Sequence, residues 1–384
     1  MKIALLTDGI YPYVMGGMQK HSYYLAKYLA KNKIQVDLFH FNQSLLNIEE
    51  LGVFEEEEKK YINSIVLEFP KLSTLPGHYV KESYRYSEII FEKIKPNLHQ
   101  YDFIYTKGFT GWKLIESKMN GLSCPRIGVN FHGYEMFQPA PSFKVKLQHL
   151  ILRKPVKWIS KHADVVFSYG GKITEIIASL GIKHQKIIEI PTGIQESWIN
   201  KNKLVVNKPK RFIFIGRYER RKGIEELNTV LKELLKTDNF IFEFIGNIPL
   251  IRQLKSKKLI YHGEMRNAEQ IKVILQKADV LVCPSHSEGM PNVIMEGMAS
   301  GLAIIATDVG AVAKMVNNKN GRLINATNLK DNLSFALMEM ISITDEELLS
   351  YKQTSIDNVN LLFLWDNVIK NVISSSVNDK ASNN

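Results

Sequence analysis

The stretch VLVCPSHSEGMPNVIMEGMASGLAIIA, Val280–Ala306, contains a strand, a loop, a helix and a second strand in that order. Its two ends are short apolar runs of the length of a buried strand. Pro291 fits the first turn of a helix, where its missing N–H is no loss, and Gly301 fits the position just after the helix end. Glu288 is therefore predicted in the loop, within reach of a ligand, and Glu296 on the helix. A solvated surface role for Glu296 remains an alternative.

Short apolar runs alternate with helical patterns along the whole chain. The first half contains seven predicted strands and two clear helical patterns: strands Lys2–Thr7, Val36–Phe41, Ile65–Phe69, Phe103–Thr106, Arg126–Phe131, Val165–Ser168 and Ile187–Ile190, helices Gln19–Lys31 and Ser83–Lys95. A polar, basic segment, Asn200–Arg211, is interpreted as a linker. The pattern then restarts with strands Phe212–Ile215, Phe242–Ile245, Leu259–His262, Val280–Cys283 and Ala303–Ala306, and helices Ile224–Lys236 and Ala268–Lys277.

This alternation predicts an α/β fold with parallel sheets and helices on both faces. The restart predicts two doubly wound, Rossmann-like domains that face each other across a cleft at the carboxyl ends of their strands. We expect an N-terminal domain over residues 1–195 and a C-terminal domain over residues 196–360. Residues 361–384 are predicted to form a helix that packs back toward the N-terminal domain, followed by a frayed tail.

Charge, cysteine content and the lack of a long apolar run limit the kind of protein that the sequence can encode. The chain has 384 residues, a formal net charge of +11 and two cysteines, Cys124 and Cys283, which are predicted to be free thiols. The N-terminus, MKIALLTDGIYPY, is typical of a first strand rather than a secretory signal, and no run reaches the ~18–20 apolar residues of a membrane span. We therefore expect a cytoplasmic protein. The charge suits phosphate-rich ligands, nucleic acid or an anionic membrane, but no nucleic-acid-binding module is recognisable.

One basic segment raises the question of membrane contact. Lys144–His162 concentrates six Lys and Arg residues among Leu, Ile, Val and Trp side chains. A basic amphipathic helix of this kind can lie on the inner face of an anionic membrane. The alternative is a surface helix whose apolar stripe packs on its own domain, and Pro155 is expected to interrupt the helical pattern.

Three further groups of residues point to an anionic ligand. Gly16 and Gly17 precede the first strong helix, so backbone N–H groups there could approach an anion. Arg217 and Lys222 follow the first strand of the second half, where a guanidinium and an ammonium would neutralise a diphosphate without a metal. His132 follows a strand of the first half, where a purely structural role is the alternative. The adjacent Arg220 and Arg221 are interpreted as a solvated face, and no Asp-x-Asp pair that would hold Mg or Mn is present.

Taken together, the motifs resemble those of the retaining, metal-independent glycosyltransferases of family four, which have the GT-B fold. The resemblance extends from GG in the first loop through HG, then GR with KG, to EGMPNVIMEGMASGLAIIATDVG, which is its most specific part. It implies a nucleotide diphosphate sugar as donor and a glycan or lipid-linked glycan as acceptor. It also implies that no metal or other cofactor is required, and that the product belongs to cell-surface polysaccharide biosynthesis.

The resemblance also implies roles for the candidate residues. Glu288 and His132 match the catalytic carboxylate and histidine beside the transferred sugar. The donor would be held by side chains and loops that contact its ribose and diphosphate: Glu296, Arg217, Lys222, Gly16, Gly17 and the backbone N–H groups of Gly289, Met290 and Asn292. The implied chemistry is front-face substitution at the anomeric carbon. A nucleotide-sugar epimerase of similar fold, and a binding protein that has lost catalysis, remain the alternatives.

Overall fold

The computed structural model describes residues 1–41, 52–71, 77–140, 142–236 and 239–377. The chain forms two compact units. Unit 1 comprises the described residues of Met1–Phe137 and Phe143–Gly193 together with those that follow Leu364, and unit 2 comprises those of Gln138–Ser142 and Ile194–Leu364. Apart from the short stretch Gln138–Ser142, the chain passes between the units at Gly193–Ile194 and returns after Leu364, close to the boundaries expected at residues 195–196 and 360–361. The predicted linker lies inside unit 2, and most of the tail predicted to fray lies outside the described residues.

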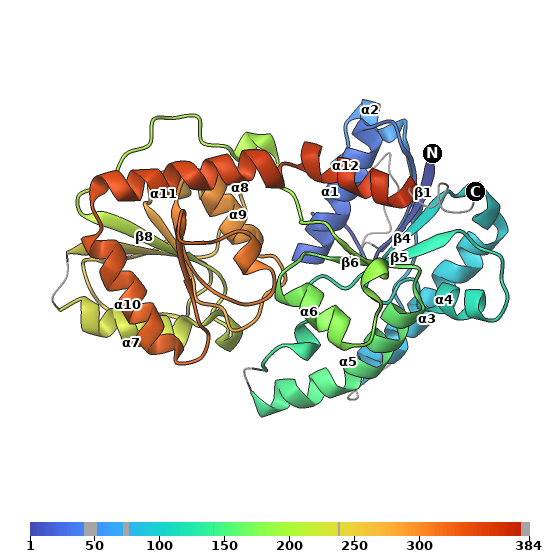
Figure 1. The fold of residues 1–384 in the computed structure, drawn as a ribbon, viewed down its shortest axis with the longest axis horizontal. Helices are drawn as coiled ribbons and strands as arrows, with labels where there is room; N and C mark the ends of the chain where they lie inside the picture. Colours follow the sequence, from blue (N-terminus) through green and yellow to red (C-terminus); the bar gives the residue numbers. More distant parts are fainter. Residues whose placement is uncertain (42–51, 72–76, 141, 237–238, 378–384) are drawn as a thin grey trace. The chain divides into compact units, whose positions relative to one another are not determined.

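Unit 1 contains a parallel sheet of seven strands in the order β3-β2-β1-β4-β5-β6-β7. The strands β1, β4, β5 and β6 of this sheet are labelled in Figure 1. Its strands are β1 (Lys2–Leu6), β2 (Gln35–His40), β3 (Ile62–Val66), β4 (Phe103–Lys107), β5 (Arg126–Asn130), β6 (Val165–Ser168) and β7 (Ile187–Glu189). Its helices are α1 (Gly17–Lys31), α2 (Glu56–Lys59), α3 (His78–Ile94), α4 (Trp112–Met119), α5 (Phe143–His162), α6 (Lys172–Ser179) and α12 (Trp365–Val377). All seven predicted strands are present, with β3 three residues earlier than expected.

The central strands of unit 1 are buried on both faces, which is why they lack polar alternation. Gly128 in β5 shows how tightly they pack. A Cβ atom at Gly128 would lie 2.5 Å from the ring of Phe167 and 2.6 Å from that of Phe103. The last helix, α12, packs on α1 within the same unit.

Unit 2 contains a parallel sheet of six strands in the order β10-β9-β8-β11-β12-β13. Its strands are β8 (Lys210–Ile215), β9 (Phe240–Ile245), β10 (Leu259–Tyr261), β11 (Val280–Cys283), β12 (Ala303–Thr307) and β13 (Gly321–Ile324). Its helices are α7 (Ile224–Leu234), α8 (Ala268–Leu275), α9 (Asn292–Ala299), α10 (Leu329–Ser342) and α11 (Asp345–Asn358), the last followed by a π-helical turn, Val359–Phe363. The sequence pattern did not predict β13, α10 or α11.

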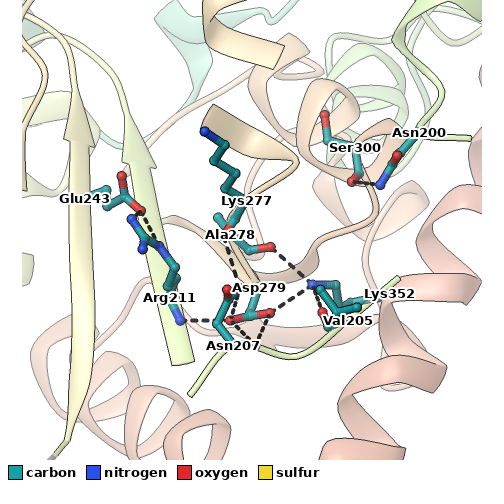
Figure 2. A network of polar contacts seen from close by, with 10 residues as sticks. All are labelled: Asn200, Val205, Asn207, Arg211, Glu243, Lys277, Ala278, Asp279, Ser300 and Lys352. Atoms are coloured by element: carbon teal, nitrogen blue, oxygen red, sulfur yellow. Dashed lines mark hydrogen bonds and ion pairs between the residues drawn. The ribbon is translucent and has the colours of Figure 1, made fainter. Parts of the chain in front are cut away.

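A buried ion pair fastens α11 to the amino ends of two strands of unit 2 (Figure 2). The Lys352 Nζ atom, on α11, lies 2.9 Å from Asp279 Oδ1 and also donates to the carbonyl oxygens of Val205 and Ala278. Asp279 directly precedes β11, and its Oδ2 atom accepts the backbone N–H of Arg211 in β8 at 2.9 Å. These contacts lie at the amino ends of β8 and β11, so they leave the carboxyl ends of both strands to the loops that carry the candidate residues.

Helix α5 is continuous over Phe143–His162, so the interruption expected at Pro155 does not occur. Proline removes one backbone donor from the helix interior, and the buried Pro155, Val156 and Ile159 side chains hold this half of the helix against unit 1. The first half of α5 exposes large apolar side chains. Within the described ranges, no helix combines the length and apolarity needed to cross a membrane.

Candidate active site

Two loops interlock at the carboxyl ends of β8 and β11 in unit 2. The His286 N–H donates to the Arg221 carbonyl oxygen at 2.7 Å, which joins the loop after β11 to the loop after β8. Gly223, which precedes α7, has a left-handed φ of +67°, and a Cβ atom there would lie 1.9 Å from the Pro284 carbonyl oxygen. Glycine is therefore required at the point where the two loops meet.

This junction brings Lys222 and Glu288 together. The Lys222 Nζ atom lies 2.6 Å from Glu288 Oε1, and the Arg221 Nη1 atom lies 3.4 Å from Glu288 Oε2. Glu288 is only 6% exposed. Burial by itself raises the pKa of Glu288, but the Lys222 and Arg221 charges, with hydrogen bonds from Lys222 and Ser285, leave that pKa below its ordinary value. Glu288 is thus held as a carboxylate inside a cationic setting.

The exposure of Arg217, Arg220 and Arg221 differs in part from what the sequence predicts. Arg221, expected on a solvated face, has a side chain only 25% exposed that reaches Glu288 and donates to the Ser287 carbonyl oxygen at 3.1 Å. Arg220 does lie at the surface, paired with Glu226. Arg217, the predicted diphosphate ligand, is 77% exposed and pairs with Glu219 at 3.0 Å. The 3₁₀ turn Arg220–Lys222 points adjacent side chains in different directions, which no spacing rule reveals.

Helix α9 presents the remaining unit 2 candidates. It begins at Asn292, with Pro291 at the N-cap rather than in the first turn, and its first N–H groups have no acceptor within the helix. Met290 is buried just before it. Glu296 is 8% exposed, so the solvated alternative for this residue is wrong.

The backbone at Glu288 and Gly289 is fixed from two directions. Gln138, which belongs to unit 2, donates from Nε2 to the Glu288 carbonyl oxygen at 2.7 Å. Ala311, in the loop after β12, donates its N–H to the Gly289 carbonyl oxygen at 2.8 Å. Gly310 beside it has a φ of +56°, and a Cβ atom there would lie 2.2 Å from the Glu288 carbonyl oxygen. Neither Gln138 nor Gly310 was among the predicted site residues.

The other candidates belong to unit 1: Gly16 and Gly17 stand at the start of α1, after the loop that follows β1, and His132 follows β5. A Cβ atom at Gly17, the first residue of α1, would meet nothing within 4 Å, so this glycine leaves open space. At Gly16 it would collide with the Gln19 side chain, whose Nε2 atom donates to Asp8 Oδ1 at 3.1 Å. The first loop therefore combines an open glycine with a carboxylate.

His132 follows β5 in a left-handed conformation with a φ of +59°. Its backbone N–H donates to Asn130 Oδ1 at 2.7 Å. The ring lies between two polar groups: Nδ1 is 2.5 Å from the Tyr169 hydroxyl oxygen, and Nε2 is 3.5 Å from Lys107 Nζ. Burial and the Lys107 charge lower the pKa of His132 well below its ordinary value, which favours a neutral ring.

Sequence reasoning missed three polar residues of this strand edge: Asp8, Lys107 and Tyr169. Burial raises the pKa of Asp8 to about 6, although a backbone hydrogen bond, Gln19 and Lys107 act against that rise. All three stand at or just after the carboxyl end of a correctly predicted strand. The rule that singled out His132 would have found them too.

Each set of candidates is thus assembled within its own unit: Gly16, Gly17 and His132 in unit 1, and Arg217, Lys222, Glu288, Gly289, Met290, Asn292 and Glu296 in unit 2. Over the described ranges, His, Cys, Asp and Glu side chains do not gather in groups of three or more that could hold a metal ion. Both cysteines are free, as expected.

Comparisons with known proteins agree with this architecture. The family described as "Glycosyltransferase Family 4" matches residues 15–198, and the family described as "Glycosyl transferases group 1" matches residues 209–342. The uncharacterized glycosyltransferase MJ1178 of Methanocaldococcus jannaschii is 25% identical over 380 residues, which cover 97% of each chain. An Escherichia coli protein, UDP-Gal:alpha-D-GlcNAc-diphosphoundecaprenol alpha-1,3-galactosyltransferase, is 28% identical over 65% of this chain and 68% of its own.

A solved structure has the same fold over nearly the whole chain. Sucrose-phosphate synthase from Thermosynechococcus elongatus aligns with a TM-score of 0.74 and 17% identity, over 97% of this chain and 98% of its own. The two parallel-sheet α/β units are therefore those of the GT-B fold. With the two family matches, which lie in the two halves of the sequence, they show that the chain belongs to the glycosyltransferases of family four.

Proposed function

We propose that the protein is a retaining, metal-independent glycosyltransferase that transfers a sugar from a nucleotide diphosphate donor to a hydroxyl group of a lipid-linked glycan. The observation that carries the proposal is the buried Glu288 carboxylate with Lys222 and Arg221 around it at the strand ends of unit 2. Lys222 has three N–H donors and Arg221 has five. Each cation can therefore keep a bond to Glu288 and give another to a phosphate oxygen.

In the proposed reaction, the bond between the anomeric carbon and the diphosphate oxygen breaks. The acceptor oxygen forms its bond to that carbon on the same face, and its proton passes to the departing phosphate. Lys222 and Arg221 stabilise the negative charge that the leaving diphosphate gains, which is the task a divalent metal performs elsewhere. Glu288 accepts hydrogen bonds from hydroxyl groups of the sugar and stabilises the positive charge that develops at the anomeric carbon.

The donor proposed first is a UDP-sugar, and the proposed process is cell-surface polysaccharide assembly. The Escherichia coli relative supports this choice, since its name states a UDP-linked donor and a diphosphoundecaprenol-linked acceptor. Glu296 is proposed to bind the ribose of the donor, because its buried side chain projects from the helix that follows the Glu288 loop.

The donor class is tested by thermal denaturation in EDTA with UDP, GDP, CDP, dTDP and ADP. UDP at 100 times its dissociation constant is expected to stabilise the folded state by about 2.7 kcal/mol. Arg217→Ala is expected to weaken UDP binding, because this exposed guanidinium, in the same segment after β8 as Lys222, can exchange its surface contact with Glu219 for a diphosphate. Arg266→Ala is the matched control, since Arg266 is 79% exposed and pairs with Glu264, two residues away in the sequence, at 3.0 Å. Equal loss in both variants, or stabilisation that requires a divalent metal, would contradict the proposal.

We also propose that α5 contacts an anionic membrane surface, where a lipid-linked acceptor would be found. Four large apolar side chains of α5 are exposed at helical spacing: Phe143, Leu147, Leu150 and Ile151. The exposed Lys146, Lys154 and Lys157 lie on or beside the same face. Apolar side chains flanked by lysines match the two terms of interfacial binding, which are hydrophobic insertion and attraction to anionic headgroups.

Sedimentation with lipid vesicles tests this contact. The protein is expected to bind phosphatidylglycerol vesicles and not phosphatidylcholine vesicles, with binding that falls as salt rises. The double variant Leu147→Ser/Ile151→Ser is expected to lose most of the binding. Leu250→Ser/Ile251→Ser is the control, because these side chains of unit 2 are 85% and 91% exposed but lie outside α5. If both variants bind as the wild type does, α5 is not the membrane contact.

A further inference from the structure

Unit 1 contains a buried lysine between two histidines. Lys107, the last residue of β4, is completely buried. Its Nζ atom lies 2.7 Å from Nδ1 of His21, on α1, and 3.5 Å from Nε2 of His132, after β5. The His21 and His132 rings meet edge to face with centroids 5.1 Å apart. Three basic groups from three elements thus share one desolvated site.

The groups that face this cluster are aromatic rings and one carboxyl group. The Tyr105 ring of β4 lies 4.9 Å below Lys107 Nζ, Tyr169 after β6 contacts His132, and Trp365 of α12 packs edge-on against His21 at 5.2 Å. Asp8, after β1, is the acidic group whose charge favours the Lys107 ammonium. Burial lowers the pKa of Lys107 and of His21 well below their ordinary values, and for His21 the Lys107 charge adds to that effect.

Hydrogen-bond chemistry limits the arrangements that this cluster allows. An ammonium group has three N–H donors and no acceptor, so the histidine nitrogens that face Lys107 must present lone pairs. The proton of neutral His132 then sits on Nδ1 and is donated to the Tyr169 oxygen. A second positive charge on either ring would stand beside the Lys107 ammonium in a dry site, where like charges repel strongly. The first proton that the cluster accepts therefore belongs on Lys107.

We propose that Lys107, supported by His21, is a positioning residue that keeps His132 neutral and fixes its proton on Nδ1. The cluster then carries its positive charge on the completely buried Lys107 amine instead of on the ring of the half-buried residue His132. The consequence for sugar transfer rests on the proposed function. The anomeric carbon gains positive charge as the diphosphate leaves, so an imidazolium beside it would raise the barrier.

Nitrogen NMR of the ¹⁵N-histidine-labelled protein tests the protonation state without donor or acceptor. His132 and His21 signals are assigned by His132→Gln and His21→Gln. In the wild type, the His132 ring is expected to show the neutral Nδ1–H tautomer, with shifts constant between about pH 5 and pH 8. A His132 ring that titrates in this window, or that carries its proton on Nε2, overturns the proposal.

The role of Lys107 is tested by Lys107→Met, with Lys113→Met as control, because Lys113 lies on α4 and pairs with Glu116 at 2.6 Å. Loss of the neighbouring charge is expected to raise the pKa of His132 in Lys107→Met and to mix its two tautomers. An unchanged pKa and tautomer would assign Lys107 a structural role only. If Lys107→Met does not fold, the tautomer of the wild-type ring still decides the proposal.

The link to sugar transfer has its own readout, the pH dependence of kcat/KM. A raised His132 pKa means that the imidazolium persists to higher pH, so the acidic limb of the profile is expected to move to higher pH in Lys107→Met. The limb should not move in Lys113→Met. If NMR shows the raised His132 pKa in Lys107→Met but the acidic limb of kcat/KM moves in neither variant, the charge of His132 has no part in the mechanism. Lack of any transfer by the wild type would instead count against the proposed function.

Discussion

Glu288→Gln is expected to lower kcat by about 10²–10³-fold, the size of effect seen when one preorganised electrostatic contact to a transition state is lost. The glutamine keeps the shape of the side chain and an oxygen that can accept from Lys222, which lies 2.6 Å from Oε1. It lacks the charge that would stabilise the anomeric carbon. Because Lys222 and Arg221 are then less neutralised, UDP is expected to bind at least as tightly as in the wild type. Steady-state kinetics and UDP titration separate the two effects.

Glu243→Gln is a matched control for this prediction. Glu243 is a buried carboxylate of unit 2 with two basic partners, Arg211 at 2.7 Å and His262 at 2.7 Å. It lies within β9, away from the loops that follow β8 and β11. Glu243→Gln is expected to cost stability and leave kcat within a factor of about two. A fall in kcat of equal size in both variants would show that the Glu288 effect is structural, and wild-type turnover in Glu288→Gln would exclude its proposed role.

Strands were predictable where an apolar run carried the whole signal. β6, VVFS, and β11, VLVC, have the predicted bounds, because each is a four-residue, mainly apolar segment buried on both faces. β13 was missed because its run, GRLI, contains an arginine and opens on glycine. Gly321 is needed there, since a Cβ atom would lie 1.9 Å from the Ile304 carbonyl oxygen. That requirement comes from the neighbouring strand and leaves no trace in the local pattern.

Helix α11 was missed for a related reason. Its buried side includes polar residues, Lys352 and Ser355, beside Leu348 and Ile356, so the apolar stripe is broken. The Asp279 carboxylate, 73 residues earlier in the sequence, makes a buried lysine acceptable at that position. Pattern reading assigns a lysine to the surface unless the partner is known.

The positions of the candidate residues were predictable where one continuous segment contains them and not where separate segments meet. Glu288 and Glu296 come from a single strand–loop–helix unit, and the structure places both in buried positions. Arg221 was misjudged as part of a solvated face, because its side chain in the 3₁₀ turn Arg220–Lys222 reaches Glu288. The Lys107 cluster joins side chains from β4, α1 and the loop after β5, and only the strand order of the sheet brings these together.

Lys352→Met is expected to destabilise unit 2 by about 3–5 kcal/mol, because it leaves the Asp279 carboxylate buried without its cation. The side chains of Lys352 and Asp279 are 4% and 0% exposed. Hydrogen exchange of the β8 and β11 amides reports the free energy of opening of this unit separately from unit 1. Lys330→Met is the control, because the Lys330–Glu233 pair has a similar N···O distance, 3.0 Å, but is 46% and 56% exposed. Lys330→Met is expected to lower the stability of unit 2 by less than about 1 kcal/mol.

The double variant Lys352→Met/Asp279→Asn tests whether Lys352→Met loses stability because it leaves the Asp279 carboxylate unpaired. The introduced asparagine carries no charge, and its side-chain oxygen can still accept the Arg211 N–H that Asp279 Oδ2 accepts at 2.9 Å. The double variant is therefore expected to be more stable than Lys352→Met alone, although it contains one more substitution. If it is less stable by the full cost of both changes, packing of the lysine stem, and not charge compensation, holds α11 to the amino ends of the sheet.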